Sequence, residues 1–374
     1  MLRPSTAPET AFSGSYAPED VRFLLRPVSL RPTPIAEKER MIQSGQRHYS
    51  ELIPPEEVPD EAYLTLYRAA VARNGARLAA DVAALAAALA ARAARRGEIV
   101  IASIARAGTP IGVLLVRTLR AMGVPAQHYS ISLIRDRGID MEALAWIAAR
   151  HDPADVVFVD GWTGKGAIST ELHKSLGERP MGFEPFLVVV ADPAGRADIS
   201  ATADDYLIPS GILGSIVSGL VSRSILNDDV VGPGEFHACV YHRHLAPADL
   251  SRGFVDTIGA LIPPGPVAAA AEDPEARQGT ARACEAAIAA IQECYGVAER
   301  NHVKPGIAEA TRVLLRRVPD RLLLQDPADP DVAHLVALAA AKGVPVDPLP
   351  ATSHFRTIAI IRSLAGRKDN HEGH

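Results

Sequence analysis

Short, continuous apolar runs recur between residues 97 and 208, and patterns of helical period separate them. Runs of this kind are typical of strands that are buried on both faces of a parallel sheet. They occupy residues 97–103, 124–132, 156–159, 186–191 and 206–208. Helical patterns cover residues 111–122, 141–150 and 167–176. Strands that alternate with helices in this way predict an α/β fold with a doubly wound parallel sheet.

The segments around this region have other patterns. Residues 1–60 are rich in proline, which removes backbone donors, so they predict an irregular N-terminal arm. Within the arm, the polar residues 38–50 form either a segment held against a site or a solvated stretch. Residues 60–96 are rich in alanine and predict two helices, divided at the Asn-Gly pair in their middle. Residues 210–224 predict a helix whose small side chains favour packing on another backbone over lining an active-site wall.

The C-terminal part has a second series of patterns. Residues 263–300 combine linker composition with an amphipathic helix, which indicates a domain boundary. The predicted elements beyond it are helices 308–317 and 331–342, strands 321–325 and 344–349, and a closing segment 353–364. The sequence therefore predicts an arm (1–60), a parallel-sheet domain (61–262), a linker with a connecting helix, and a small α-β-α domain (301–374).

Charge is unevenly distributed along the chain. The sequence has 39 Lys and Arg against 44 Asp and Glu, a formal net charge of −5, which argues against wholesale coating of nucleic acid. Residues 300–374 hold 11 basic and 8 acidic side chains, so this part is at +3 and the preceding part at −8. The C-terminal part is therefore the better candidate for a polyanionic partner.

Three features bear on where the protein acts. Its three cysteines lack a CxxC spacing and are too few for a disulfide framework. The first residues contain no apolar segment of a secretory signal, and no apolar run reaches the ~18–20 residues that cross a bilayer. We therefore expect a soluble, cytoplasmic protein with no membrane partner. The sequence leaves a homo-oligomer open and gives no set of metal ligands.

The strongest chemical signal lies in residues 156–170. A buried strand ends at Asp160, and a loop of Gly, Thr and Lys leads into the next helix. Ligands of open α/β sheets bind at the carboxyl ends of the strands. Glycines let backbone N–H groups approach an anion, and a helix N-terminus attracts negative charge. The pattern favours a phosphate site with Lys165 as a point charge, and an ordinary Gly-rich turn is the alternative.

A second loop, residues 103–110, follows the first strand of the series. Its backbone amides can turn toward an anion, with Arg106 beside them. If the two strands are neighbours, two anion sites flank Asp160, whose carboxylate can accept hydrogen bonds from ribose hydroxyls. Phosphoribosyl pyrophosphate (PRPP), which has phosphate at both ends and hydroxyls between them, fits this arrangement.

These loops resemble those of a known family. The stretch around Asp160 resembles the PRPP-binding signature of type I phosphoribosyltransferases, and residues 103–110 resemble their pyrophosphate loop. The similarity is closer to the bacterial phosphoribosyltransferase family of tellurite-resistance gene clusters, some members of which are labelled cysteine protease. The stretches that carry it are SGSYAPEDVRFLL (13–25), KERMIQSGQRHYSELI (38–53), SIARAGTPIGVLL (103–115), VDGWTGKGAIST (159–170) and SGLVSRS (218–224). One departure is Gly161, where type I enzymes usually place a second acid.

The resemblance implies transfer of a phosphoribosyl group from PRPP to a base-like small-molecule acceptor, in tellurite or stress resistance. Mg²⁺ would supply the principal charge, and the protein would position the reactants. The implied PRPP-binding residues are Ser103, Arg106, Ala107, Gly108, Thr109, Asp160, Gly161, Thr163, Gly164, Lys165, Gly166 and Ala167. Asp160 would act on the ribose as a catalytic residue. Arg135 and Arg137 would close over the leaving group, unless they only form a solvated loop.

Two alternatives to transfer stay open. The missing second acid allows a non-catalytic module that senses a nucleotide and binds RNA. The other alternative is a cysteine hydrolase that uses Cys239, which has three histidines nearby in sequence. In a strand, however, His242 and Cys239 point to opposite faces, and metal binding by these histidines has the same weakness. Cys284 and Cys294 lie in a helical pattern and are expected to be packing residues.

Residues 304–319 resemble the pelota-type RNA-binding domain, which is related to the ribosomal L7Ae-like fold, and the likeness runs to about residue 361. Arg312 and Arg316 are four residues apart on one helical face, Arg317 is beside them, and Lys304 precedes the helix. Arginine forks suit phosphate recognition. The sequence therefore predicts RNA binding by these four residues, with a merely solvated basic face as the alternative.

Overall fold

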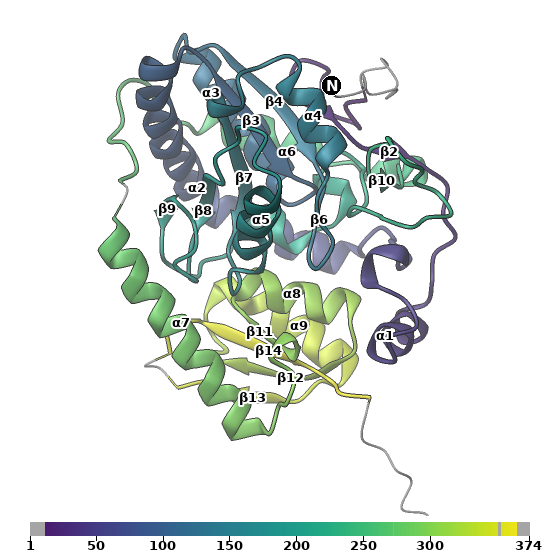
Figure 1. Ribbon diagram of the computed structural model, residues 1–374. Coiled ribbons are helices and arrows are strands. Elements are labelled where there is room, and N and C mark those ends of the chain that lie inside the picture. The colour runs from purple at the N-terminus through teal and green to yellow at the C-terminus, as the bar shows by residue number, and fades with distance from the viewer. Residues whose placement is uncertain (1–11, 272, 351–352, 365–374) are drawn as a thin grey trace, which may run out of the picture.

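Two sheets organise the molecule, one above the other in Figure 1. This computed structural model describes residues 12–271, 273–350 and 353–364. The start of the predicted arm (1–11) and the end of the predicted C-terminal domain (365–374) therefore lie outside the described residues. The first sheet has six parallel strands in the order β1-β4-β3-β7-β8-β9. They are β1 (Arg22–Phe23), β4 (Ala126–Ile131), β3 (Ile99–Ile104), β7 (Val156–Trp162), β8 (Leu187–Ala191) and β9 (Ile199–Thr202).

Helices cover both faces of this sheet. One face carries α2 (Glu61–Arg96), α3 (Gly108–Ala121) and α6 (Ser251–Ala260), and the other carries α4 (Met141–Ala148) and α5 (Ala167–Glu178). Side chains alternate along a strand, so Ile101 packs with the first group and Ala102 with the second. The predicted α/β fold with a doubly wound parallel sheet is confirmed.

The predicted pair of helices over residues 60–96 is one continuous helix, α2, and that prediction was wrong. Helix α2 begins after Asp60, whose carboxylate accepts a hydrogen bond from the amide of Tyr63. Asn74 and Gly75 are poor helix formers, but tertiary contacts hold them in the helix. The Asn74 amide nitrogen donates to the carbonyl of Leu207 and to Asp331, each at 2.8 Å, and Gly75 leaves room for Ile258 and Leu261.

The segment of residues 203–237, which follows β9, has no α-helix and no strand, so the predicted strand 206–208 and helix 210–224 are both absent from this described stretch. It contains two short 3-10 turns, Pro209–Ile212 and Ser215–Val217. Its small residues permit close approach to other parts of the chain: a Cβ on Gly211 would lie 3.6 Å from the ring of Trp162. Residues of this segment line the cavity described below, which is the interpretation that the sequence disfavoured.

The N-terminal arm is irregular, as predicted, apart from short elements. These are β1, β2 (Arg26–Pro27), α1 (Ile35–Gln43) and a 3-10 turn, Tyr49–Glu51. Strand β2 pairs with β10 (Ala238–Cys239), while β5 (Leu133–Ile134) and β6 (Gly138–Ile139) form a hairpin. Helix α1 lies beside the second sheet's domain rather than on the first sheet (Figure 1), which brings the arm across the space between the domains.

The second sheet forms the middle layer of an α-β-α sandwich. Its strands, in spatial order, are β11 (Val303–Pro305), β14 (Thr357–Ile361), β12 (Pro319–Leu324) and β13 (Val346–Pro348). Helices α8 (Ile307–Arg316) and α9 (Ala333–Lys342) lie between this sheet and the first domain. Helix α7 (Pro274–Tyr295), which the sequence placed in the linker, covers the other face through Cys284, Ile288 and Ile291.

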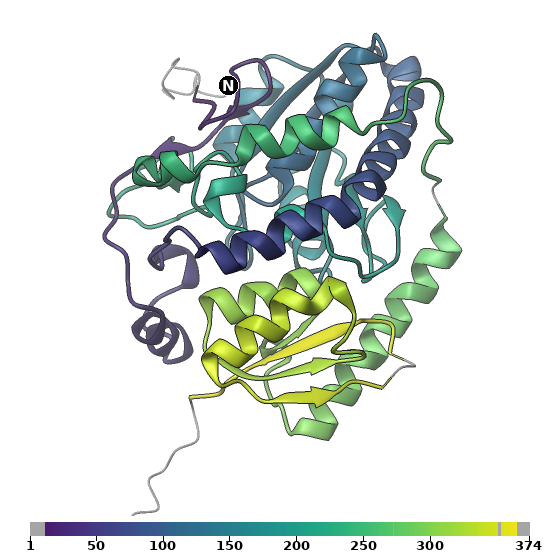
Figure 2. The ribbon, with the colours of Figure 1, turned by 180° about the vertical axis from the view of Figure 1, so that it is seen from behind.

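The two domains are packed against each other along α2, which passes directly above α9 in Figure 2. Asp331 of the second domain accepts hydrogen bonds from Arg73 at 3.0 Å and from Asn74. Arg356 reaches back to Asp204 of the first domain at 3.0 Å. A shared apolar cluster that includes Leu207 and Leu314 lies beneath these pairs. Within the described residues, no helix is both long and apolar enough to cross a membrane.

Candidate functional site

The loops that follow β3 and β7 lie side by side, because these two strands are neighbours in the sheet. Ser103 is in register with Val159 across the pair. Gly108, the first residue of α3, makes the approach possible: a Cβ there would lie 2.3 Å from the carbonyl oxygen of Val159. The sequence predicted that these two loops converge, and they do.

The loop after β7 is fixed by an acid that the sequence did not single out. The hydroxyl of Thr163 donates to Asp192, which also accepts from the amides of Arg196 and Ala197 at 2.9 Å. Gly166 has φ +82° and forms the N-cap of α5, a conformation that favours glycine. Gly164 contacts the second domain, since a Cβ there would lie 2.6 Å from Cγ of Glu309. Helix α8 therefore covers this loop directly.

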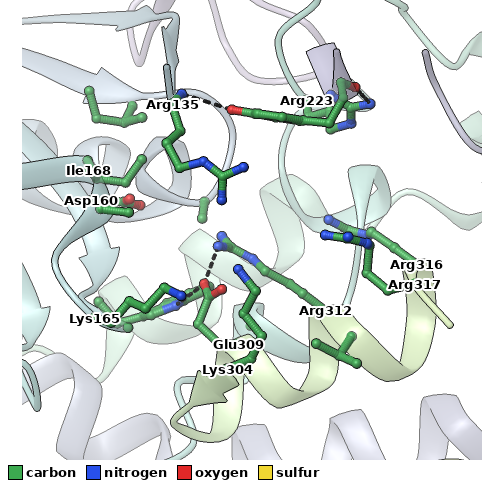
Figure 3. Close-up of a pocket in the computed structure, with 18 of the residues that line it drawn as sticks. Arg135, Asp160, Lys165, Ile168, Arg223, Lys304, Glu309, Arg312, Arg316 and Arg317 are labelled. Atoms are coloured by element: carbon green, nitrogen blue, oxygen red, sulfur yellow. Dashed lines mark hydrogen bonds and ion pairs between the residues drawn. The ribbon is translucent and has the colours of Figure 1, made fainter. Parts of the chain in front are cut away.

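A cavity of about 630 Å³ lies between the two loops and the second domain. Its walls come from four parts of the chain: both loops, the arm with α1, the irregular segment 210–218, and β11 with α8. Figure 3 shows basic side chains from both domains pointing into this space. The site is thus composite, since neither domain encloses it alone.

Most of the predicted PRPP-binding residues line this cavity. They are Arg106, Ala107, Asp160, Thr163, Gly164, Lys165, Gly166 and Ala167. Ser103, Gly108, Thr109 and Gly161 lie behind the lining. The hydroxyl of Ser103 bonds to His128 at 2.8 Å, and that of Thr109 bonds to Ser130 at 2.8 Å, so both belong to a buried polar network.

The two predicted leaving-group arginines are placed differently. Arg135 lines the cavity, with its amide donating to the hydroxyl of Tyr49 at 2.8 Å. Arg137 pairs with Glu51 at 3.0 Å and lines a separate pocket beside His237. The structure brings only Arg135 to the converging loops.

The four predicted RNA-binding residues, Lys304, Arg312, Arg316 and Arg317, all line the same cavity. The sequence placed them on a separate site in a separate domain. Helix α8 instead turns its basic face toward the loop after β7, and the guanidinium of Arg312 stacks 4.7 Å from the Trp162 ring. The residues predicted for PRPP binding and those predicted for RNA binding therefore line one cavity.

Positive charge predominates in the lining. Among the described lining residues, nine are lysine or arginine and three are aspartate or glutamate. The basic residues are Lys38, Arg106, Arg135, Lys165, Arg223, Lys304, Arg312, Arg316 and Arg317. Burying so many like charges is unfavourable without a counter-charge.

The crowding lowers the pKa of several of these groups. Burial, followed by the charges of neighbouring cations, lowers the pKa of Lys165 to about 7. Burial lowers the pKa of Lys304 to about 8, although Glu309 opposes the shift. Burial and the charge of Arg106 lower the pKa of Arg316 to about 9. A bound anion would relieve all three shifts, because it favours the charged forms.

The acids of the cavity are too few to balance it. Burial raises the pKa of Asp160 to about 6, and its Oδ1 accepts a hydrogen bond from the amide of Gly161 at 2.8 Å. Burial would also raise the pKa of Glu309, but the charges of Arg312 and Lys304 outweigh it and lower that pKa. Glu309 pairs with Arg312 at 2.5 Å. Glu309 is thus committed to an ion pair, while Asp160 faces the cavity.

Two residues and one segment of the site were not predicted, or were only partly predicted, from the sequence. Arg223 lines the cavity, and Glu56 pairs with Arg106 at 2.8 Å. Neither residue has a local pattern that marks it, because each comes from an irregular segment. Polar residues 38–50 were left open as a segment held against a site, and Lys38 and Tyr49 do line it.

The cysteines lie away from this cavity. Cys239 is fully buried in β10, and burial raises the pKa of its thiol far above the usual value. Two of the neighbouring histidines lie against other groups: His237 bonds to Ser132 at 2.7 Å, and Nε2 of His242 lies 3.7 Å from Glu56. Cys284 packs in the second-domain core, as expected, whereas Cys294 is exposed on α7 and is not a packing residue.

Comparison with known proteins identifies the family. Residues 14–259 match the family described as tellurite-like stress resistance cysteine protease StiP. The chain belongs to this family. It is also 42% identical, over 365 residues, to the protein named cysteine protease StiP from Acinetobacter baylyi, covering 94% of this chain and 95% of that protein. Residues 282–363 match the PELOTA RNA binding domain.

These findings overturn the predicted enzyme class. The sequence predicted a PRPP-dependent glycosyltransferase, whereas the curated relative is named a cysteine protease, which is a hydrolase. The associated expectations of PRPP and an acceptor base as partners have no support. Two converging loops with the sequence pattern of anion sites were the reason for the error, because such a pattern indicates a ligand's charge and not its reaction.

Similarity to solved structures does not support the transferase prediction either. The hypoxanthine phosphoribosyltransferase of Trypanosoma cruzi is 16% identical, with a TM-score of 0.28 over 36% of this chain and 81% of that one. The K68R mutant of that enzyme, complexed with IMP, gives the same identity and TM-score over 47% and 86%. Likeness of this extent carries no argument about activity. Among the described residues, no group of three or more His, Cys, Asp or Glu is placed to hold a metal. The Mg²⁺ that was expected to enter with PRPP stays an untested prediction.

Proposed function

We propose that the composite cavity binds a phosphorylated nucleotide unit, presented as the end of a single RNA strand. The observation that carries the proposal is the excess of basic side chains around one enclosed space, supplied by both domains. Phosphate is the anion that arginine forks and backbone N–H groups recognise best. The match of residues 282–363 to an RNA-binding domain supports RNA as the source of that phosphate.

The size of the cavity limits the ligand. Its volume of about 630 Å³ is within the range of pockets for small ligands. A nucleotide or two can enter such a space, but a double helix cannot. Tyr49 and Trp162 line the cavity and offer aromatic faces, on which unstacked bases of single strands commonly lie. Asp160 supplies an acceptor for a ribose hydroxyl, a group that distinguishes RNA from DNA.

The test measures binding of a fluorescent RNA hexamer by anisotropy at several salt concentrations. A double variant, Arg312→Ala with Arg316→Ala, should weaken binding and reduce the salt slope by about 1.4, the value for two lost phosphate contacts on a single strand. The matched control is Arg321→Ala, which removes an arginine of the same domain that pairs with Asp320 and Asp347 away from the cavity. Equal binding by the double variant and the control would contradict the proposal.

A competition arm separates the two sources of the phosphate. The competitors of the labelled hexamer are the unlabelled single strand, an unlabelled duplex of the same sequence and adenosine monophosphate. Displacement by the single strand at much lower concentration than by the mononucleotide supports an RNA end as ligand. Displacement by the mononucleotide alone would show that a free nucleotide is the ligand.

The name of the Acinetobacter baylyi relative favours a second candidate function, thiol-dependent hydrolysis of peptides. Cys239 is the residue that the sequence put forward as nucleophile, but β10 would have to leave β2 for a substrate to reach it. The folded arrangement predicts that iodoacetamide alkylates Cys294 and spares Cys239, as read by peptide mass spectrometry. Casein hydrolysis that Cys239→Ser abolishes and Cys294→Ser retains would establish Cys239 as the nucleophile; hydrolysis retained by both variants would exclude it.

A further inference from the structure

The guanidinium of Arg106, in the loop after β3, is already paired inside the protein. Its Nη1 donates to Oε2 of Glu56 at 2.8 Å and to the carbonyl of Val221 at 3.0 Å. Only 8% of the Arg106 side chain is exposed, yet the residue lines the cavity. The carboxylate of Glu56 therefore stands where an anionic ligand of Arg106 would have to be.

Other donors surround the same carboxylate. The backbone amide of Ser215 donates to Oε1 of Glu56 at 2.5 Å. Gly214 leaves the necessary space, since a Cβ on it would lie 1.7 Å from that oxygen. The positive charges of Arg106 and Arg316 lower the pKa of Glu56 to about 2, against the opposing effect of its burial. A guanidinium and a backbone amide thus contact one anionic group, as they do in anion sites, and Arg316 lines the same cavity.

The surroundings also contain polar atoms that the carboxylate does not satisfy. Nε2 of His242 lies 3.7 Å from Oε2 of Glu56, and in the described part of the chain it has no hydrogen-bond partner. The hydroxyl of Ser215 is likewise buried without a partner there. A carboxylate has two oxygens, whereas a phosphate monoester presents three terminal oxygens and up to two charges. Phosphate therefore matches this set of donors better than Glu56 does.

Glu56 sits on a segment with little to hold it. Residues 52–60 have no helix or strand, and Pro55, Glu57 and Val58 are exposed. The neighbouring anchors are Ile53, which packs in a small apolar cluster, and Asp60, which caps α2. Loss of the Glu56 contact would therefore free only the short stretch between these anchors.

We infer that Arg106, Arg316, the Ser215 amide and His242 form a phosphate subsite at one end of the cavity, and that Glu56 occupies it as an internal competitor. This inference rests on the proposed function, because it assigns one end of that same cavity to the terminal phosphate of the ligand. Exchange of one anion for another keeps Arg106 neutralised, so no buried cation is left unpaired. Since the pKa of Glu56 stays at about 2, only a competing anion, and not a change of pH near neutrality, removes the contact.

The experiment compares Glu56→Gln with Glu57→Gln, which changes the exposed neighbour in the same way. Each protein is titrated with RNA hexamers that differ only in a 5′-monophosphate, with their 3′ ends labelled, and with inorganic phosphate. Removing the competing charge should strengthen binding of the phosphorylated hexamer about tenfold in Glu56→Gln. The hexamer that lacks the monophosphate should gain little, and Glu57→Gln should behave like the wild type. The deciding quantity is the affinity for the phosphorylated hexamer divided by the affinity for the unphosphorylated one. If this ratio is unchanged or smaller in Glu56→Gln than in the wild type, Glu56 is a permanent structural partner.

A second measurement on the wild-type protein keeps the inference testable if Glu56→Gln does not fold. Cleavage after Glu56 or Glu57 by a glutamate-specific protease, read by mass spectrometry, should become faster when the phosphorylated hexamer or inorganic phosphate is added, because the segment is released. Unchanged or slower cleavage at saturating phosphate would overturn the subsite. If no protein binds RNA, the proposed function fails, and the inorganic phosphate data alone then decide whether the subsite exists.

Discussion

Two charged regions lie between the domains, and they differ in how their charges are balanced. In the first, Asp331 and Asp204 face Arg73, Arg77 and Arg356, and every pair is within 3.3 Å. In the second, the cavity, nine described basic side chains line the walls with three acids, and Arg106 and Arg317 each have a further acid, Glu56 and Glu39, just behind the lining. Arginines of similar type thus hold the domains together in one place and leave a charge excess in the other.

The difference shows how to separate docking contacts from binding contacts. A buried charge that has its partner within the protein needs no ligand, and removing the partner is destabilising. A group of like charges whose pKa values are lowered by one another has stability to gain from an added anion. Packing of the two domains should therefore weaken when a carboxylate is removed from the first region. Anion binding should weaken when a basic side chain of the cavity loses its charge.

The largest expected effect is on the first region. Asp331→Ala removes the acceptor of Arg73, Asn74 and the Leu207 amide, so the free energy of unfolding should fall by about 3 kcal/mol. Asp326→Ala, which removes only an exposed acceptor of the Ala328 amide, should change it by less than about 1 kcal/mol. Urea denaturation followed by circular dichroism measures both. Similar losses in the two variants would remove the proposed role of Asp331 in docking.

The next largest effect is a dependence of RNA affinity on pH, which arises from two lysines of the cavity. The pKa of Lys165 is lowered to about 7 and that of Lys304 to about 8, so affinity for the RNA hexamer should fall by about tenfold between pH 7 and pH 9. Without ligand the sign reverses. An unfolded lysine keeps its proton to about pH 10, so the unfolded state binds more protons above pH 7 and stability should rise with pH in that window.

Lys165→Met provides the control for this pH dependence. The variant should have weaker binding at pH 7, a flatter dependence of affinity on pH and a smaller rise in stability. Anisotropy and urea denaturation at pH 7, 8 and 9 supply the data. A pH profile that Lys165→Met leaves unchanged would show that Lys165 does not titrate in this range.

The smallest expected effect is on the choice between RNA and DNA. Asp160→Asn should reduce the preference for RNA over the matching DNA hexamer about fivefold, the value of one hydrogen bond of about 1 kcal/mol. Asp152→Asn, an exposed change on the same domain, should leave the ratio as it is. The ratio should also fall below pH 6 in the wild type, because the raised pKa of Asp160 is about 6 and its protonated form accepts less well. A ratio independent of both the variant and pH would separate Asp160 from the ribose.

Much of the fold could be predicted because its signals are local. Strands β3 and β7 are largely apolar runs, and Asp160, two residues before the end of β7, marks the edge where the loops meet. Patterns of this kind fail where a distant contact decides. The Asn74-Gly75 pair reads as a break, but Asp331, more than 250 residues away, holds it in the helix. Residues 210–224 have helical spacing, but their hydrogen bonds run to other segments, such as the amide of Ser222 to the carbonyl of Val240.

The sequence predicted the two parts of the site separately, but not that they line one cavity. The loops around Arg106 and Lys165 and the basic helix with Arg312 each have a local pattern. Nothing local says that the two patterns face one another. The enzyme class could not be obtained this way either. Loops of this composition suit many phosphate ligands, and the reactivity of a thiol depends on burial and neighbours that the sequence does not give.

By itself, the sequence determined the parallel sheet, the Gly-rich loops at its carboxyl edge and the basic face of α8, since each depends on residues close together in the chain. Only the tertiary structure decided that these loops and that helix enclose one cavity, that Glu56 neutralises Arg106, and that Cys239 is buried. The physical reason is that charge balance and solvent exposure depend on the three-dimensional surroundings of each group. Those surroundings are built from segments that lie 50 or more residues apart in the chain.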